Sequence, residues 1–351
     1  MRKELFAACA LAACSAAASA QSNVTLYGLV DTTIRYSTNE NAAGDNKLQL
    51  TDGVLTGSRW GVRGVEDLGG GLKALVTLES GFAPDTGGML QGGRLFGRQG
   101  YVGLDGSFGK VLFGRQYTLA HEILSAYESF AFANNSILGY QGGNYTGLRY
   151  DNMVKVAKAF GPVSVTAAYT FGETAGSLST NASKAVGATY VNGPLQLGAV
   201  YQATNNVTSA FFNAVSAAQA SKQTVWGVGG TYKTGPATLY AGYTDSKLDV
   251  ANIKNHVLYG GINYELTPAL QLIGTVQADK LKRPGNDGDR MTSGLMLDYY
   301  LSKRTDVYVE VDYTKLKDGW VALANNAGLG SANVFGNDSR VGIMAGVRHK
   351  F

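Results

Sequence analysis

Apolar and polar residues alternate along several long segments of the chain. In 24–36, Leu26 and Ile34 share one side, whereas Asp31 and Arg35 share the other. The same period of two recurs in 71–81, 163–171, 270–279, 306–314 and 340–351. Charge on one face and apolar groups on the other are typical of a β-strand that lies between two different solvents. Most of these segments are long enough for a tilted strand to cross a bilayer, which needs about ten residues.

Short turns and long loops separate the alternating segments. Turn residues mark short connections at 67–71, 105–109, 161–162, 192–194, 235–236, 267–268 and 302–303. Longer polar connections lie at 37–55, 82–93, 118–147, 174–182, 204–222, 246–254, 282–288 and 317–338. Together these fifteen connections predict sixteen strands. A soluble sandwich would also alternate, but its strands are usually shorter.

Short turns on one side and long loops on the other are the layout of an outer-membrane barrel. We therefore predict an all-β fold, a 16-stranded antiparallel transmembrane β-barrel, whose size leaves an aqueous channel. No stretch of the sequence approaches the roughly 18 to 20 consecutive apolar residues of a spanning helix. Hydrophobic residues make up only 45% of the chain, which fits a barrel because the lumen-facing half of each strand is polar.

The first twenty residues are typical of an export signal. Arg2 and Lys3 precede an apolar run at 5–13, and the small residues 18–20 form a cleavage site before Gln21. The mature chain would then be one barrel domain, 21–351, located in the cell outer membrane after export through the periplasm. As an alternative, 11–14 also looks like a lipoprotein box with Cys14 as the lipidated residue. Because Cys9 and Cys14 are the two cysteines of the chain, we expect neither disulfide nor thiolate chemistry in the mature protein.

The segment 118–147 has no sustained alternation, although alternating segments lie on both sides of it. A structureless insert of this length in a compact fold usually has a function. Arg98 and Arg149 flank it, and Glu122 and Glu128 lie within it. Opposed charges at a constriction are how a water-filled pore screens ions. We therefore predict that 118–147 folds into the barrel and narrows it, with ordinary solvated loop charges as the alternative interpretation of both glutamates.

Other basic residues share the lumen side of their strands. Arg59 and Arg63 are an even number of positions apart and therefore lie on the same side of their strand, whereas Trp60 lies on the other side. By the same alternation, Arg35 and Lys155 also face the lumen. An arginine at the lipid midplane would cost about 2–4 kcal/mol, which favours the lumen. General lumen lining is the alternative to a constriction role for Arg59, Arg98 and Arg149. Without Arg2, Lys3 and Glu4 the formal charge falls from +4 to about +3, which is too small to indicate nucleic acid.

Four stretches together resemble the general trimeric porins of Gram-negative bacteria, and most closely the betaproteobacterial branch of Burkholderia, Bordetella and Neisseria type. They are Asn23–Asp31, Ser58–Lys73, Gly106–Arg115 and Val347–Phe351. The resemblance implies a homotrimer in which the third extracellular loop, at 118–147, folds inward. It also implies an arginine cluster of Arg59, Arg98 and Arg149 opposite the acids of that loop. The loop departs from enterobacterial relatives because it lacks their Pro-Glu-Phe-Gly motif and offers only Glu122 and Glu128.

The resemblance implies further partners and a function. Phe351 would serve as the terminal residue in assembly by the barrel-assembly machinery, and outer-membrane lipid and lipopolysaccharide would surround the barrel. The function is passive diffusion of ions and small hydrophilic solutes, with weak charge selectivity, and a substrate-preferring channel is the alternative.

An outer-membrane barrel enzyme is the competing class. It would need Asp–His or Ser–His pairs, and His121, His256 and His349 are far apart in sequence, with no carboxylate at triad or ligand spacing. We therefore expect no catalysis, no metal and no cofactor.

Overall fold

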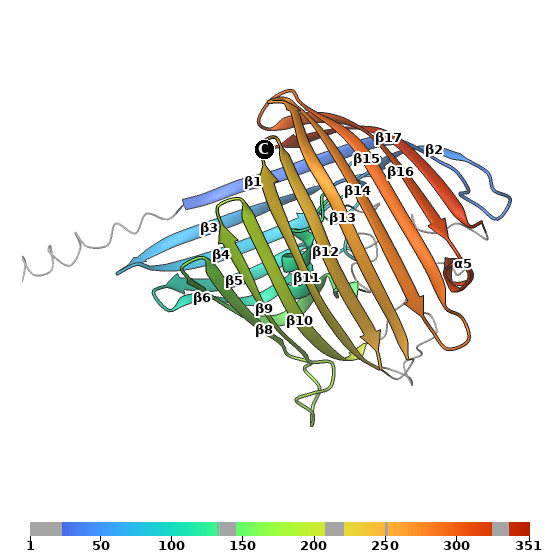
Figure 1. Cartoon of the computed structure of the whole chain (residues 1–351). Coiled ribbons are helices and arrows are strands. Elements are labelled where there is room, and N and C mark those ends of the chain that lie inside the picture. The colour runs from blue at the N-terminus through green and yellow to red at the C-terminus, as the bar shows by residue number, and fades with distance from the viewer. Residues whose placement is uncertain (1–22, 132, 134–144, 208–220, 250–251, 325–336) are drawn as a thin grey trace, which may run out of the picture.

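The computed structural model describes residues 23–131, 133, 145–207, 221–249, 252–324 and 337–351 (Figure 1). The predicted signal segment 1–20 and most of 134–147 lie outside the described residues. The elements are β1 (Asn23–Ser37), β2 (Lys47–Asp52), β3 (Arg59–Gly69), β4 (Leu72–Gly81), β5 (Gln99–Gly106), β6 (Gly109–Tyr117), α2 (Leu119–Ser125), β7 (Arg149–Phe160), β8 (Val163–Thr170), β9 (Ser183–Asn192), β10 (Leu195–Val207), β11 (Ser221–Thr234), β12 (Ala237–Leu248), β13 (Ile253–Thr267), β14 (Leu270–Lys282), β15 (Gly288–Tyr300), β16 (Thr305–Leu316), α5 (Gly319–Ala324) and β17 (Ser339–Lys350).

The strands form one closed antiparallel barrel. From β3 to β17 each strand pairs with the next along the chain, and β17 pairs with β1. On its other edge, β1 pairs with β2 through Thr32–Ser37 and with β3 through Asn23–Leu29. β2 and β3 therefore act as one interrupted strand. The predicted sixteen-stranded antiparallel barrel is confirmed.

The prediction of an unbroken loop at 37–55 was wrong, because β2 lies inside it. Leu48 and Leu50 of β2 alternate with Gln49, and this short alternation was the available signal. The break between β2 and β3 is held by Asp31 of β1. The Thr56 N–H donates to Asp31 Oδ2 over 2.7 Å, and the Asp31 N–H donates to Ser58 Oγ over 2.9 Å.

Apolar side chains face outward and polar side chains face inward. In β16 the exposed fraction of Val309 is 57%, whereas that of the adjacent Glu310 is 1%. This is the reverse of a soluble protein, and it suits a wall between lipid and a polar lumen. No helix in the described ranges is long and apolar enough to cross a membrane.

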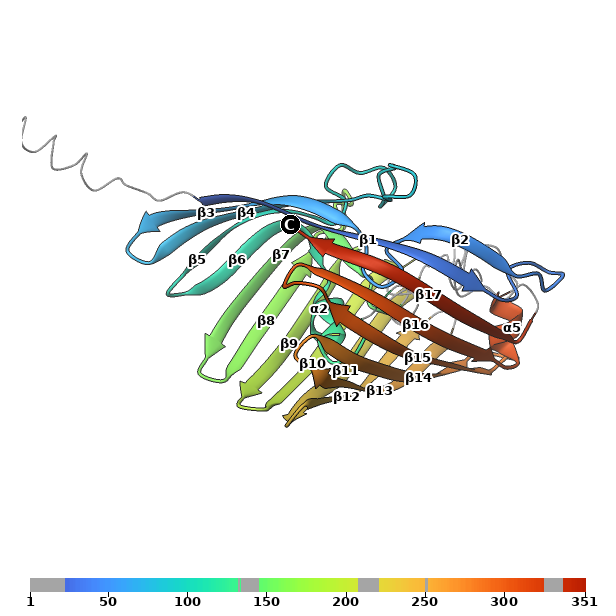
Figure 2. The same cartoon turned by 90° about the horizontal axis from the view of Figure 1, so that it is seen from above.

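Helix α2 packs against β9, β10 and β11 on the face opposite their exposed apolar side chains (Figure 2). Thr118 caps its N-terminus by accepting a hydrogen bond from the His121 N–H over 3.2 Å. Its buried residues are Leu119, Ala120, Ile123 and Leu124. One apolar stripe of this kind positions a short helix against a sheet.

Glycines on the wall make room for this stripe. A Cβ on Gly227 would lie 2.8 Å from Leu124 Cδ2, and one on Gly198 would lie 2.9 Å from Ile123 Cγ2 and clash with the ring of Tyr127. Real side chains do not tolerate such distances. The glycines therefore let the helix approach the backbone of the wall.

The barrel closes where its first and last strands, β1 and β17, meet. The Phe351 N–H donates to the Gly28 carbonyl over 3.1 Å, and the Gly28 N–H donates to the Phe351 carbonyl over 3.0 Å. The ring of Phe351 covers Gly28, where an added Cβ would clash with it. The last residue thus belongs to the seam between β17 and β1.

Candidate functional site

A cavity of about 500 Å³ lies between the wall and the segment that follows β6. Its lining includes Arg59 at the start of β3, Arg98 just before β5 and Arg149 at the start of β7. His121 and Glu122 of α2 line it as well. The structure therefore brings together the three arginines that were assigned to the basic side of a constriction and one of the two loop glutamates.

Tyr117, the last residue of β6, connects two of these arginines. Its hydroxyl accepts hydrogen bonds from Arg98 Nη2 over 2.7 Å and from Arg149 Nη2 over 2.5 Å. Arg149 also lies over the tyrosine ring, with Cζ 4.2 Å from its centroid. Hydrogen bonds to charged groups contribute about 1.5–3 kcal/mol each, so Tyr117 fixes the spacing of both guanidinium groups. Sequence reasoning missed Tyr117; its place directly before the irregular segment was the only signal.

Glu79 of β4 neutralises one arginine. Its Oε1 lies 2.8 Å from Arg98 Nε, and its Oε2 accepts a hydrogen bond from the Tyr27 hydroxyl over 3.0 Å. Both charged side chains are buried. Arg59 Nε donates to the Gly57 carbonyl over 3.0 Å. Within the described ranges, neither Arg59 nor Arg149 forms an ion pair, whereas Arg98 does.

Glu122 faces a lysine rather than an arginine. Lys155 Nζ of β7 lies 2.5 Å from Glu122 Oε2 and donates to the Tyr117 carbonyl over 3.0 Å. Lys155 was expected to be general lumen lining, and the structure places it beside the cavity. Asp52 at the end of β2 supplies a second carboxylate to the cavity lining.

The structure places Glu128 apart from the arginines. Its Oε1 accepts a hydrogen bond from the Thr275 hydroxyl of β14 over 2.6 Å, and its Oε2 accepts one from the Phe130 N–H over 3.2 Å. Glu128 is not among the described residues that line the arginine cavity. Its described contacts attach the segment after α2 to the wall, a position that no period in the sequence indicated.

Two further predicted basic residues also lie outside this cavity. Arg35 of β1 is buried, with Nη2 at 2.7 Å from Asp312 Oδ2 and Nη1 at 3.8 Å from Glu310 Oε2. Arg63 of β3 is exposed, and its Cζ lies 4.7 Å from the centroid of the Tyr27 ring. Both follow the predicted parity, but they are not part of the arginine cluster.

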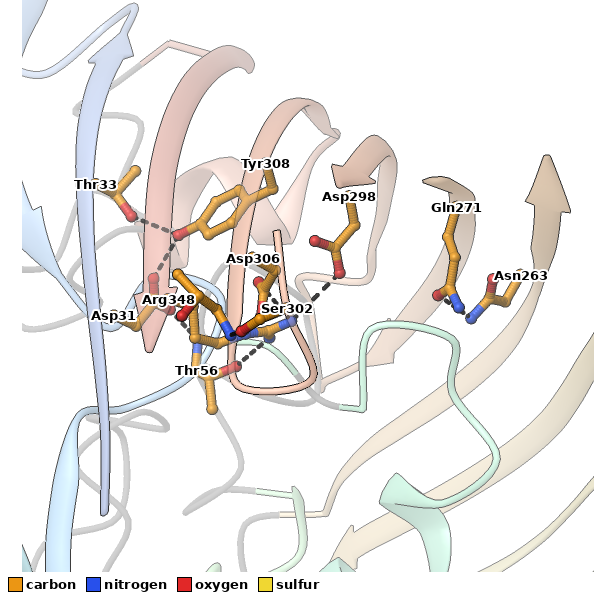
Figure 3. Close-up of polar contacts among 11 residues, drawn as sticks. Asp31, Thr33, Thr56, Asn263, Gln271, Asp298, Ser302, Asp306, Tyr308 and Arg348 are labelled. Atoms are coloured by element: carbon orange, nitrogen blue, oxygen red, sulfur yellow. Dashed lines mark hydrogen bonds and ion pairs between the residues drawn. The ribbon is translucent and has the colours of Figure 1, made fainter. Parts of the chain in front are cut away.

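A second polar cluster joins β1, β15, β16 and β17 around Arg348 (Figure 3). Arg348 Nη2 lies 3.3 Å from Asp298 Oδ2 and 3.0 Å from Asp306 Oδ2, and Nη1 donates to Thr56 Oγ1 over 3.1 Å. The Tyr308 hydroxyl donates to Asp31 Oδ1 over 2.6 Å. This side of the lumen thus carries acidic charge and also holds the residues that precede Arg59.

His121 stacks on the ring of Tyr117 at 5.1 Å between centroids. Burial, together with the nearby charges of Arg149 and Arg98, lowers the pKa of His121 to about 3. The imidazole is therefore neutral at ordinary pH and adds no charge to the cavity. In the described part of the chain, no group of three or more His, Cys, Asp or Glu side chains could hold a metal ion.

The structure contains an Asp–His pair that the sequence analysis did not anticipate. Asp245 of β12 and His256 of β13 are opposite each other in the sheet, and His256 Nδ1 lies 2.7 Å from Asp245 Oδ2. The Tyr243 hydroxyl lies 2.9 Å from the same nitrogen. Antiparallel pairing brings these residues together, and spacing along the chain does not reveal such a contact.

The family match and the similar proteins indicate the same family. Residues 7–319 match the family described as Gram-negative porin. An outer membrane porin protein of Bordetella pertussis is 30% identical over 400 aligned residues, and outer membrane porin protein 32 of Delftia acidovorans is 32% identical over 377, each alignment covering 100% of both chains.

Solved structures include similar barrels. The anion-selective porin from Comamonas acidovorans is 27% identical with a TM-score of 0.78, covering 94% of this chain and 100% of that one. OmpT of Vibrio cholerae in its trimer form is 19% identical with a TM-score of 0.69, covering 94% and 99%, and shares the fold.

Proposed function

Since this chain belongs to the Gram-negative porin family and is an outer-membrane porin that forms a channel, we propose that its arginine cavity is the pore constriction and gives the channel a weak preference for anions. Ions and small hydrophilic solutes diffuse through it passively. In this proposal 118–147 is the constriction loop, with Arg59, Arg98 and Arg149 on the basic side and Glu122 on the acidic side.

The absence of ion pairs at Arg59 and Arg149 in the described residues carries this proposal. Arg98 is neutralised by Glu79 and Glu122 by Lys155, which leaves two guanidinium groups facing the cavity and Asp52 as the remaining carboxylate of its lining. Fixed positive charge at a narrow point favours anions. The similar porin from Comamonas acidovorans is described as anion-selective.

The preference is weak because acidic side chains also lie on the wall beside the cavity, where Thr56 contacts both Asp31 and Arg348. The cluster around Arg348 includes Asp31, Asp298 and Asp306. In a wet lumen at physiological salt, charges are screened over about 8 Å, so each group of charges acts mainly on the ions that pass close to it.

We also propose that the protein is not an enzyme. The Asp245–His256 pair lies on the outward parity of β12 and β13, and its closest described partner is the Tyr243 hydroxyl rather than a serine nucleophile. The expected partners are two further copies of the chain in a homotrimer, the barrel-assembly machinery, and outer-membrane lipid with lipopolysaccharide.

The test is single-channel recording of the protein in a planar bilayer under a salt gradient. We expect an anion-biased reversal potential and conductance steps in groups of three. Arg59→Gln and Arg149→Gln should each lower the anion-to-cation permeability ratio by about twofold to fivefold, the effect of one charge a few ångströms from a hydrated ion.

Arg63→Gln is the matched control, because it removes the same charge from a residue that does not line the cavity. Its reversal potential should stay close to that of the unaltered protein. A cation-biased channel, or equal effects of Arg149→Gln and Arg63→Gln, would contradict the proposal.

A further inference from the structure

A second hollow of about 650 Å³ lies on the outer surface, at the ends of β13 and β14 next to the connection 283–287. Its lining includes Lys254, His256, Lys282 and Arg283, with Asp287 as its carboxylate. The long connections of such barrels are extracellular and the short turns periplasmic, so this hollow lies at the extracellular rim.

The strand residues that line the hollow point away from the lumen. On β13, Asn255 and Val257 are fully buried toward the inside, and Lys254 and His256 share the opposite parity with the exposed Leu258. On β14, Gln277 and Asp279 are inward. Lys282 therefore shares the outer face with the exposed Val276.

Register places the basic groups side by side. Lys254 of β13 is opposite Lys282 of β14, and on its other side it is opposite Lys247 of β12. Like charges directly opposite each other destabilise a sheet unless something lies between them. Asp249 partly compensates Lys247, at 2.9 Å between Nζ and Oδ1.

Asp287 compensates only one cation of the hollow. Its Oδ2 lies 2.7 Å from Lys282 Nζ, and its Oδ1 accepts a hydrogen bond from the Arg283 backbone N–H over 3.0 Å. No ion pair involves the side chains of Lys254 or Arg283 within the described ranges. An anion in the hollow would meet both of them.

Exposed apolar side chains lie next to the hollow and indicate that the ligand has an apolar part as well as an anionic group. Leu258 and Val276 are 62% and 48% exposed, and they lie on the same two strands and the same outer face as the basic groups. A soluble anion would use only the hollow. A lipid would place its phosphate among the cations and its acyl chains along the apolar band, which matches both halves of the surface.

We propose that this hollow binds a phosphate group of a phosphorylated glycolipid in the outer leaflet, with the acyl chains lying along Leu258 and Val276. The site deepens the lipid contact of the proposed function and is independent of the arginine cavity. Lys254 and Arg283 supply the charge, and Lys282 with Asp287 shapes the loop beside them.

The experiment measures binding of bisphosphorylated lipid A to the detergent-purified protein by native mass spectrometry. The double variant Lys254→Ala/Arg283→Ala should bind it roughly tenfold to thirtyfold more weakly, the expected effect of two cations at an anionic lipid surface. The matched control is Lys303→Ala/Arg304→Ala, which removes two cations from the short turn at the other rim. It should bind like the unaltered protein.

Two comparisons identify the ligand class. In the first comparison, lipid A without its phosphates is added to the unaltered protein. It should bind about as weakly as bisphosphorylated lipid A binds to the double variant. In the second comparison, millimolar inorganic phosphate should not displace bisphosphorylated lipid A from the unaltered protein. Equal binding of both lipids, equal weakening by both double variants, or displacement by inorganic phosphate would overturn the proposal. Single-channel conductance should be unchanged in the double variant, because neither residue lines the arginine cavity. A failed selectivity prediction would therefore not affect the outcome of this lipid-binding test.

Discussion

At the scale of single residues, the charge of the proposed constriction depends on which arginines form ion pairs. Arg98 and Arg149 donate to the same Tyr117 hydroxyl, yet in the described part of the chain Arg98 forms an ion pair, with Glu79, and Arg149 forms none. A buried ion pair contributes little net charge, but removing one partner leaves the other uncompensated. We therefore expect Glu79 to act on selectivity, although it was not assigned to the constriction from the sequence.

Glu79→Gln should make the channel more anion-selective. The variant keeps the shape of the side chain but removes the carboxylate that compensates Arg98. The reversal potential should therefore shift toward stronger anion preference, the opposite of the shift expected for Arg149→Gln. The lost charged hydrogen bonds should also lower the free energy of unfolding by about 1–3 kcal/mol. Both are measurable, by bilayer recording and by denaturant titration.

Glu173→Gln provides the control for this variant. It makes the same change of charge on an exposed loop residue for which no ion pair is present among the described residues. A shift toward cations in Glu79→Gln, or the same shift in both variants, would show that the Arg98–Glu79 pair does not set the charge of the constriction.

At the scale of elements, α2 is positioned by the wall on which it packs. Its apolar stripe lies over Gly198 and Gly227, and its polar residues His121 and Glu122 are left facing the cavity. The glycines thus decide how far the helix extends into the lumen. A larger side chain on the wall would move it toward the pore axis.

Gly198→Leu should lower the single-channel conductance. The new side chain would overlap Tyr127 and Ile123, and such overpacking typically costs about 1–3 kcal/mol of stability. Gly260→Leu is the control, because Gly260 faces outward and a Cβ there meets the Tyr240 carbonyl oxygen at 3.5 Å, an ordinary contact. An unchanged conductance in a folded Gly198→Leu barrel would mean that α2 does not limit the pore.

His121 on the same helix predicts a pH dependence of stability. Its folded-state pKa of about 3 is below the ordinary value of 6.5. Below pH 6.5 the unfolded chain takes up a proton that the folded chain does not, so the free energy of unfolding falls as the pH falls toward 3. Between pH 7 and pH 5 this loss amounts to about 1–2 kcal/mol.

His121→Phe keeps a ring against Tyr117 and removes the titrating group. Denaturant unfolding at pH 7 and pH 5 should show a smaller loss of stability in the variant than in the unaltered protein. Equal losses in both proteins would mean that the imidazole is hydrated and titrates normally in the lumen.

Elements with a strict period were predictable, and contacts between distant elements were not. Alternation and turn residues indicated the strands, and parity placed Arg35 and Asp31 inside. The alternation of Leu48 and Leu50 in β2 was too short to stand out from a loop. Partners such as Tyr308 and Asp31, 277 positions apart, depend on closure of the sheet. Glu128 could not be placed because its segment has no period.

At the scale of the whole molecule, the barrel depends on one seam between its first and last strands. β1 and β17 pair from Leu29 with Lys350 to Ser37 with Gly342, and Gly28 exchanges two backbone hydrogen bonds with Phe351. An open edge in the hydrocarbon would cost several kcal/mol for each unpaired backbone group. Closure is therefore a requirement for insertion, and Phe351 lies at the end of the seam.

Phe351→Ala should weaken the seam without removing its backbone bonds. The ring is 44% exposed and covers Gly28, so its partial burial contributes about 1–2 kcal/mol. We expect a smaller folded fraction on refolding into vesicles, measured by heat-modifiable mobility in gels. Phe160→Ala is the control, because Phe160 is an exposed aromatic residue that ends β7 at the same rim, outside the seam.

Assembly in cells separates the packing role of Phe351 from recognition by the assembly machinery. If the ring only packs, the loss of folded protein in the outer membrane should equal the loss on refolding into vesicles. A much larger loss in cells would indicate that the machinery recognises this side chain, as we propose. If Phe351→Ala and Phe160→Ala behave alike in both settings, the terminal aromatic residue has neither role, and closure depends on the backbone pairing of β1 with β17 alone.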